Sequence, residues 1–285
     1  MTVRSRSPVE WVWEEVKIAV TAVGAVSDNA SLAGTTRAAM VQRIGLAEPW
    51  DALRQGFADF SKYRGDTVFL CVVYPVAGLV LGWLASGHNV LPLAFPLLAG
   101  FSLIGPLAAV GLEEMSRLGE TGAHVTWVDA FGVFRSHAIG KIVVLGLLLA
   151  MIFLLWLVAA GLIYDATLGP RPPASLGVFV GEVFGTGAGW TMIVAGMGVG
   201  FLFAVLVLAI GAVSFPLLLD RDVRLETAVA TSVRAVAANP VAMAEWGLIV
   251  AAGLVIGSIP FLRGLTIVLP VLGHATWHLY RRVIR

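Results

Sequence analysis

Two histidines near the carboxyl end of the chain, His274 and His278, have a spacing that suits metal binding. Four residues apart on a helix, both imidazoles lie on one face, where they could share a metal ion or bracket the edge of a haem. A third ligand would have to come from Glu113, Glu114 or Asp220. Such histidines more often cap helix ends, hydrogen-bond to neighbouring helices or lie at the level of lipid headgroups. Metal binding is therefore an alternative hypothesis.

A short run of alternating charges, Asp220-Arg221-Asp222, suggests a second chemistry. Paired aspartates can hold a divalent ion together with a nucleotide-sugar phosphate. A three-residue match is frequent by chance, and mixed charges are also typical of a helix end that leaves hydrocarbon for water. Arg234 could pair with one of these aspartates or with a lipid phosphate. As an exposed pair it would contribute at most about 1 kcal/mol.

Three prolines, Pro106, Pro216 and Pro270, lie inside hydrophobic runs shortly before polar residues. Each proline removes a backbone donor and typically kinks its helix. If the three kinked helices pack around one axis, we expect the polar groups that follow them to meet near the cytoplasmic face. This candidate polar cluster consists of Glu113, Glu114, Arg117, Asp220, Arg221, Asp222, Arg234, Asn239, His274 and His278.

Motifs of the common enzyme classes are missing from the sequence. It has no nucleotide-binding glycine loop, zinc-protease helix motif or nucleophile elbow. The single cysteine, Cys71, excludes an intrachain disulfide framework. A net charge of +1 with dispersed basic residues is not typical of a nucleic-acid-binding protein. We therefore expect no catalytic residues, no cofactor and no nucleic-acid partner, which disfavours an enzyme without excluding one.

The composition is that of a membrane protein, with 58% hydrophobic and only 13% charged residues. A helix needs about 20 apolar residues to cross a bilayer, and several runs have this length. We predict an all-α membrane protein with six transmembrane helices. The predicted spans are Thr67–Ser86, Val90–Gly111, Ile142–Tyr164, Trp190–Leu219, Met243–Ser258 and Leu262–Tyr280.

Lysine and arginine residues predict the orientation of these spans. All but two of the 19 basic residues, Arg171 and Arg263, fall on one side of the predicted membrane. Basic residues accumulate in cytoplasmic loops. We therefore expect a bacterial inner-membrane protein with both termini in the cytoplasm, as an even number of spans requires.

The spans belong to three predicted repeats of an amphipathic helix followed by a helical hairpin. The repeats cover about residues 49–111, 126–219 and 225–280 of a membrane domain at 49–285. The amphipathic segments are expected to end at Gly65, Gly140 and Asn239, residue types that often end helices. Residues 1–48 are expected to form an N-terminal amphipathic helix, at 8–26, and a linker.

Small and charged residues within the spans give further expectations. Gly253 and Gly257 lie four residues apart, so they share one helix face and favour close packing against another helix. Glu245, near the start of the fifth span, has two interpretations. It is either a buried carrier of a proton or cation, because intramembrane carboxylates are often functional, or an exposed interfacial residue.

Four blocks of the sequence resemble an uncharacterised bacterial integral-membrane family, domain of unknown function 2189. They are GP at 105–106 with GLEEMSR at 111–117, FPLLLDRD at 215–222, TSVRAVAANP at 231–240 and LPVLGHATWHLYR at 269–281. The resemblance extends over about residues 40–285. It implies a multi-span inner-membrane protein and no established activity.

We expect a non-enzymatic binding, assembly or membrane-organising component. Its partners would be the lipid bilayer and other membrane proteins, and the sequence identifies no substrate. One alternative is a small-solute or lipid transporter with a cavity lined by kinked helices. The other is a metal- or haem-associated membrane protein that uses His274 and His278.

Overall fold

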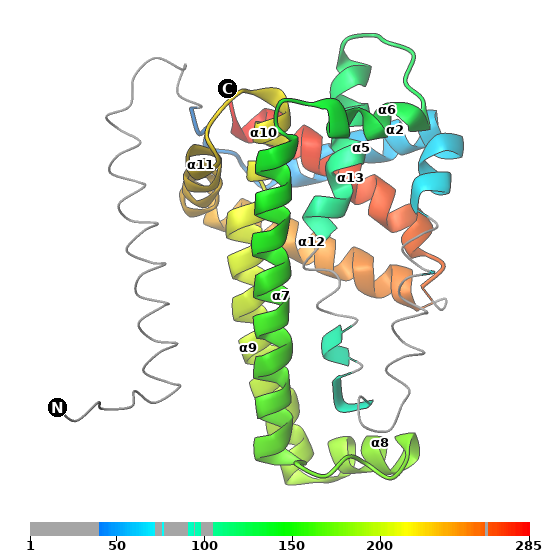
Figure 1. Cartoon of the computed structure of the whole chain (residues 1–285), viewed down its shortest axis with the longest axis vertical. Coiled ribbons are helices and arrows are strands. Elements are labelled where there is room, and N and C mark those ends of the chain that lie inside the picture. Colours follow the sequence, from blue (N-terminus) through cyan, green and yellow to red (C-terminus); the bar gives the residue numbers. More distant parts are fainter. Residues whose placement is uncertain (1–39, 72–75, 77–90, 94, 98–104, 260–261) are drawn as a thin grey trace, which may run out of the picture.

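The structure, a computed structural model, describes residues 40–71, 76, 91–93, 95–97, 105–259 and 262–285 (Figure 1). These residues form helices and contain no β-strand, only an isolated bridge between Val41 and Ile284. The all-α class is therefore confirmed for them. The elements are α2 (Ala47–Cys71), η1 (Leu91–Leu93), α5 (Gly105–Glu120), α6 (Trp127–Ala130), η3 (Phe131–Arg135), α7 (Ile139–Thr167), α8 (Leu176–Gly185), α9 (Gly187–Gly211), α10 (Ser214–Asp220), α11 (Leu225–Ala238), α12 (Pro240–Ser258) and α13 (Leu265–Val283).

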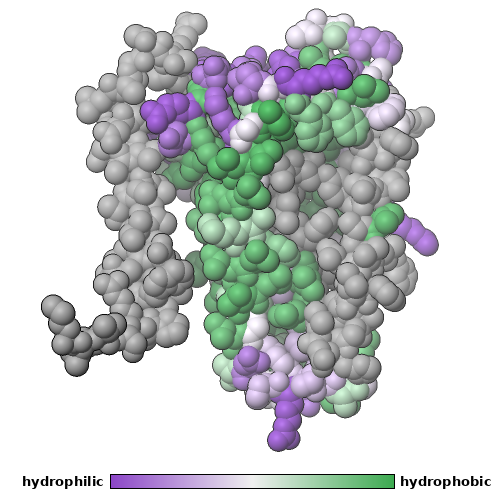
Figure 2. Space-filling model, viewed as in Figure 1, coloured by the Kyte–Doolittle hydropathy of each residue, from purple (hydrophilic) through white to green (hydrophobic). Residues whose placement is uncertain are grey.

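The two longest apolar helices, α7 and α9, run side by side along the long axis of the molecule and form a stem (Figure 1). At the lower end of the stem in Figure 1, α8 (Leu176–Gly185) connects them. Ser175 caps α8 by accepting a hydrogen bond from the N–H of Val178, and Thr186 caps α9 in the same way through Gly189. The stem carries the hydrophobic band of the surface, and hydrophilic residues gather beyond its ends (Figure 2).

Three helices among the described residues are long and apolar enough to cross a membrane. They are Ile139–Thr167, Gly187–Asp220 and Pro240–Ser258, which contain the third, fourth and fifth predicted spans. Membrane-spanning helices are therefore confirmed by length and composition.

The other three predicted spans are not confirmed. Thr67–Ser86 and Val90–Gly111 fall largely outside the described residues, as do all of the predicted N-terminal helix and most of the following linker. Residues 262–280 contribute most of α13, which is not one of the three apolar helices. Its second half carries His274, His278, Arg281 and Arg282, which makes it more polar than those three helices. The six-span count remains a prediction.

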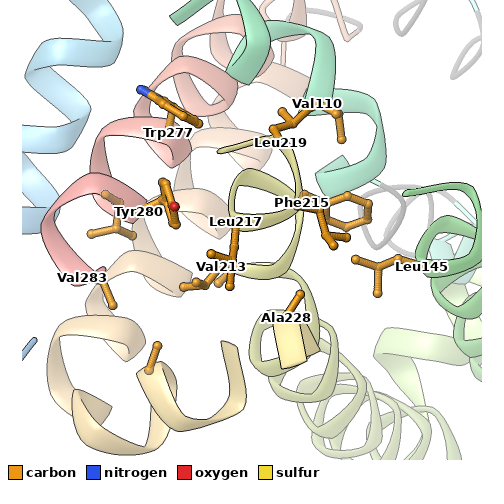
Figure 3. Packing of buried hydrophobic residues seen from close by; sticks show 14 of the residues in the cluster. Val110, Leu145, Val213, Phe215, Leu217, Leu219, Ala228, Trp277, Tyr280 and Val283 are labelled. Carbon is orange, nitrogen blue, oxygen red and sulfur yellow. The ribbon is translucent and has the colours of Figure 1, made fainter. Parts of the chain in front are cut away.

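At the other end of the stem, α2, α5, α6, η3, α10, α11 and α13 pack into a head (Figure 1). The short helix α10 lies at its centre, and its residues from Ser214 to Leu219 are all buried. A helix that is apolar on every side must be covered on every side. Figure 3 shows the side chains that do so, with Val110 of α5, Leu145 of α7, Ala228 of α11, and Trp277 and Tyr280 of α13 around Phe215, Leu217 and Leu219.

The predicted helix ends are partly wrong. Asn239 does end α11, although its φ of −130° is not left-handed. Gly65, in contrast, lies inside α2, where the irregular backbone of Tyr63, with φ −109° and ψ 15°, marks a kink instead. Gly140 lies in the first turn of α7. The preceding helix η3 ends earlier, at Ser136, whose backbone is extended. A helix tolerates glycine at a cost of about 1 kcal/mol, so glycine alone does not end it.

The three prolines have different surroundings. Pro216 lies in the first turn of α10, and the helix breaks at Ala212 and Val213, about one turn before it. This is where a proline leaves a carbonyl without its partner. The hydroxyl of Ser232 accepts the N–H of Val213 at the break, at 3.2 Å. Pro270 lies inside α13. Pro106 is the second residue of α5, and the residues before Gly105 lie outside the described ranges.

In Figure 1, α12 and α13 run obliquely across the direction of the stem. The two helices approach closely at Gly253 and Gly257 of α12, as the spacing of these glycines predicts. A methyl group added at Gly257 would lie 2.8 Å from the side chain of Leu265.

The predicted threefold repeat is not confirmed, because its amphipathic segments take different forms. They are part of the long α2, the short pair α6 and η3, and the regular α11.

The contact between α2 and α13 depends on Gly56. A methyl group there would lie 2.5 Å from the carbonyl oxygen of Val271 and 2.6 Å from the backbone nitrogen of Ala275. We expect Gly56→Ala to lower the free energy of unfolding by about 1–3 kcal/mol, because the two backbones must separate. Thermal unfolding followed by tryptophan fluorescence would measure this. Gly140→Ala, which meets open space, is the control. Equal stability of the two variants would contradict the expectation.

Candidate functional site

A buried network of four side chains joins α2, α5 and α13 in the head. We name Asp59, Ser116, His274 and His278 the inter-helix network. The hydroxyl of Ser116 donates to Oδ2 of Asp59 at 2.7 Å, and it lies 2.8 Å from Nδ1 of His274. Nε2 of His278 lies 2.8 Å from the same oxygen of Asp59. One carboxylate oxygen thus connects the two predicted histidines through Ser116.

The hydrogen bonds decide how His274 is protonated. Since the single hydroxyl proton of Ser116 goes to Asp59, Nδ1 of His274 must donate to the serine oxygen. His274 is fully buried, and its Nε2 has no hydrogen-bond partner among the described residues.

Asp59 is the charged member of the network. Burial alone would raise the pKa of its carboxyl group. Hydrogen bonds from His278 and Ser116, together with the charges of the two histidines, outweigh this effect and lower the pKa below its ordinary value. Asp59 is therefore held as a carboxylate that accepts hydrogen bonds from two other helices. Asp59 is not among the site residues predicted from the sequence.

A second group of polar side chains connects α5, α10 and α13 at the edge of the head. Oδ2 of Asp220 accepts the hydroxyl of Tyr280 at 2.6 Å and lies 3.7 Å from the guanidinium of Arg281. Glu120 accepts the indole N–H of Trp277 at 2.9 Å and pairs with Arg281 at 3.3 Å. Arg281 thus bridges two carboxylates from two different helices.

The remaining charged residues pair locally. Arg117 binds Glu114 through two hydrogen bonds of 2.7 Å, a bidentate geometry that together with the charge raises the pKa of the guanidinium. Lys141 donates to the exposed Asp222 at 2.7 Å, which lowers the pKa of that carboxyl. Arg221 lies 3.5 Å from Asp220. Among the described residues, Arg234 hydrogen-bonds to Ala230 and Thr231, on its own helix.

Asn239 holds a separate segment of the chain. Its side-chain oxygen accepts the N–H of Ile44 at 2.8 Å, and its amide nitrogen donates to the carbonyl oxygens of Gln42 and Ala235 at 3.0 Å each. The backbone N–H of Gln42 also donates to the carbonyl oxygen of Val283 at 2.8 Å, and the backbones of Met40 and Arg285 pair with each other. The end of α11 therefore fastens residues 40–44 against the carboxyl end of α13.

Glu113 has no comparable partner. It is fully buried in α5, and neither carboxyl oxygen has a hydrogen-bond partner among the described residues. Burial raises the pKa of this carboxyl well above its ordinary value. Glu113 follows Leu112, which packs on Gly273 of α13, and it lies one turn before Arg117. It is therefore buried near the junction of α5 with α13.

The ten predicted residues are thus distributed over several contacts in the head and do not converge on one point. His274 and His278 contact Asp59 and Ser116, and not Glu113, Glu114 or Asp220. Within the described ranges, no three or more side chains of histidine, cysteine, aspartate or glutamate are arranged to hold a metal ion. Asp59 lies on α2 about one turn from Gly56 and Tyr63, both of which face other helices, so its position follows from helix packing and not from a sequence motif.

The apolar stem and the helical head define the class of the molecule as an integral membrane protein without strands in its described part. Residues 94–220 match the model of a family described as predicted integral membrane protein, domain of unknown function 2189. The chain is similar to this family over that segment, which confirms the resemblance seen in the sequence. The blocks at 231–240 and 269–281 lie outside the matched residues. No curated protein and no solved structure matches the chain.

Proposed function

We propose that this protein is a non-enzymatic binding component of the bacterial inner membrane. In this proposal the head faces the cytoplasm and binds another membrane protein. The observation that carries it is an exposed row of apolar side chains on α6 and η3, which we name the aromatic ridge. It consists of Trp127, Val128, Phe131 and Phe134, exposed by 39%, 56%, 46% and 67%.

The aromatic ridge is ordered by its own contacts. The rings of Trp127 and Phe131 meet edge to face at 6.0 Å between centroids, and those of Phe131 and Phe134 stack at 6.2 Å. Asp129 fixes the start of α6 by accepting the backbone N–H of Thr126 at 2.7 Å, as part of a capping box. Ordered and exposed aromatic side chains are typical of binding surfaces, because little side-chain entropy is lost on association.

The pairing of polar residues supports a structural head over a transport pathway. Apart from Glu113, the predicted site residues form hydrogen bonds or ion pairs with other parts of the described chain, which gives the ridge a rigid base. The stem offers little polar lining, because the sequence has no charged residue between Lys141 and Asp165 or between Glu182 and Asp220. Transporter sites usually place polar groups near the middle of the membrane. The geometry therefore favours binding over solute transport.

The proposed orientation is supported by the distribution of basic residues. Arg117, Arg135, Lys141 and Arg281 belong to the head or to the start of the stem, whereas Arg171 precedes α8 at the far end. Cytoplasmic segments carry more lysine and arginine. We extend this orientation to the six predicted spans, with both termini in the cytoplasm.

Photocrosslinking in intact membranes tests the proposal. A benzophenone amino acid at Phe134 should form an adduct with one discrete protein. The matched control is Phe201, which is 66% exposed in the middle of α9 and should react with lipid only. If the probe at Phe134 also reacts with lipid only, the ridge is a membrane anchor and the proposal is wrong.

A further inference from the structure

An apolar groove of about 240 Å³ lies between α2, α12 and α13, away from the aromatic ridge. Its lining includes Phe57 of α2, Ile249 and Gly253 of α12, and Val271 of α13. Pockets for drug-sized ligands usually measure about 300–1,000 Å³, so this groove suits a narrower occupant. A single hydrocarbon chain has that shape.

A polar pair lies next to the groove on the side nearer the start of α12. The indole N–H of Trp50 donates to Oε1 of Glu245 at 2.8 Å. Trp50 shares a face of α2 with Phe57, seven residues on, and Glu245 shares a face of α12 with Ile249 and Gly253. The helix faces that line the groove therefore both continue to this pair.

Glu245 has one oxygen left for a ligand. Its Oε2 is buried and has no hydrogen-bond partner among the described residues. A buried acceptor without a partner costs about 1–3 kcal/mol, and a donor from a ligand would recover this cost. The exposed ring of Trp50 also attracts cations, since the face of an indole carries negative charge. Both features favour a positively charged hydrogen-bond donor.

We propose that this groove binds one acyl chain of a zwitterionic phospholipid whose ammonium headgroup lies against Glu245 and Trp50. Arg54, four residues after Trp50 and with a side chain 84% exposed, offers a cation for the phosphate of the same headgroup. Glu245 lies near the start of a helix apolar enough to span the membrane, which is the depth at which headgroups meet hydrocarbon. This site does not depend on the proposed partner of the aromatic ridge.

Native mass spectrometry of the full chain in detergent tests the lipid site. The probes are a phosphatidylethanolamine and a phosphatidylglycerol with the same acyl chains, since only the first carries an ammonium group. We expect the wild-type chain to bind the ethanolamine lipid about tenfold more tightly, the size of a charge-assisted hydrogen bond. Equal binding of the two lipids, or tighter binding of the glycerol lipid, would overturn the proposal.

Two variants separate the headgroup from the chain. Glu245→Gln keeps an acceptor for Trp50 but removes the charge, so the preference between the two lipids should disappear. Ile249→Trp should fill the groove and weaken both lipids by at least about tenfold. Val255→Trp, at a position of α12 that is 65% exposed and not part of the groove lining, should behave as wild type. An undiminished preference in Glu245→Gln would show that another group selects the headgroup, and the proposal would fail.

Discussion

Replacing Asp59 with alanine should lower the free energy of unfolding by about 2–3 kcal/mol. The carboxylate accepts hydrogen bonds of 2.7 and 2.8 Å from Ser116 and His278, in a site where the side chains of Asp59 and His278 are only 23% and 13% exposed. Hydrogen bonds to charged groups contribute about 1.5–3 kcal/mol, and the remaining partners would be left partly buried without an acceptor. Denaturant or thermal unfolding of the purified chain measures the loss.

Asp51→Ala is the matched control, because Asp51 is another aspartate of α2. Its carboxylate is 43% exposed and pairs with Arg54 and Arg282 only at 3.6 and 3.7 Å. Exposed ion pairs contribute about 0–1 kcal/mol, so Asp51→Ala should change stability little. A double-mutant cycle with His278→Ala should give a coupling of about 1 kcal/mol or more between His278 and Asp59. Similar losses for Asp59→Ala and Asp51→Ala, without coupling, would contradict a structural role of the network.

The apolar helices could be predicted because their signal is local. The runs that became α7, α9 and α12 contain enough apolar residues in sequence to cross a bilayer, whatever packs against them. Asn239 before Pro240 was likewise a local stop signal, and α11 ends there.

The surroundings of the histidines could not be predicted because they depend on helix packing. His278 and Asp59 are 219 residues apart, and only the close approach at Gly56 brings α2 against α13. The spacing of His274 and His278 correctly places both side chains toward one network. The spacing carries no information about the partners of the two histidines. These partners are Ser116 and Asp59, and not a set of metal ligands.

The stops at Gly65 and Gly140 show how context overrides residue type. Glycine ends a helix where the backbone must turn left-handed, and neither position requires this. At Gly65 the helix continues, because the irregular backbone at Tyr63 changes its direction instead. The similar amphipathic segments of the three predicted repeats therefore end in different local structures.

Glu113→Gln should remove a pH dependence of stability from the head. Glu113 lies two residues beyond the predicted second span, in a helix that is not one of the three apolar ones. Its carboxyl group is fully buried without a partner, and burial raises its pKa well above the ordinary value of 4.5. The folded chain therefore keeps a proton that the unfolded chain releases above this pH.

The sign of the effect follows from proton linkage. Below pH 4.5 both states carry the proton, and the group has no pH-dependent effect on stability. As the pH rises from there toward the pKa of the folded state, wild-type stability should fall by up to about 1.4 kcal/mol per pH unit. A glutamine has no proton to release, so this slope should be absent in the variant, which should be the more stable of the two at neutral pH.

Thermal unfolding of wild type and variant between about pH 5 and 8 measures the two slopes, since the predicted loss accumulates in this range. Glu114→Gln is the neighbouring control. Its carboxylate forms a bidentate pair with Arg117, so the change should lower stability at every pH and leave the wild-type slope intact. If Glu113→Gln keeps the wild-type slope, Glu113 is not the buried acid of the head. A reduced slope in Glu113→Gln alone would mean that the packing around Glu113 has evolved around a neutral carboxylic acid.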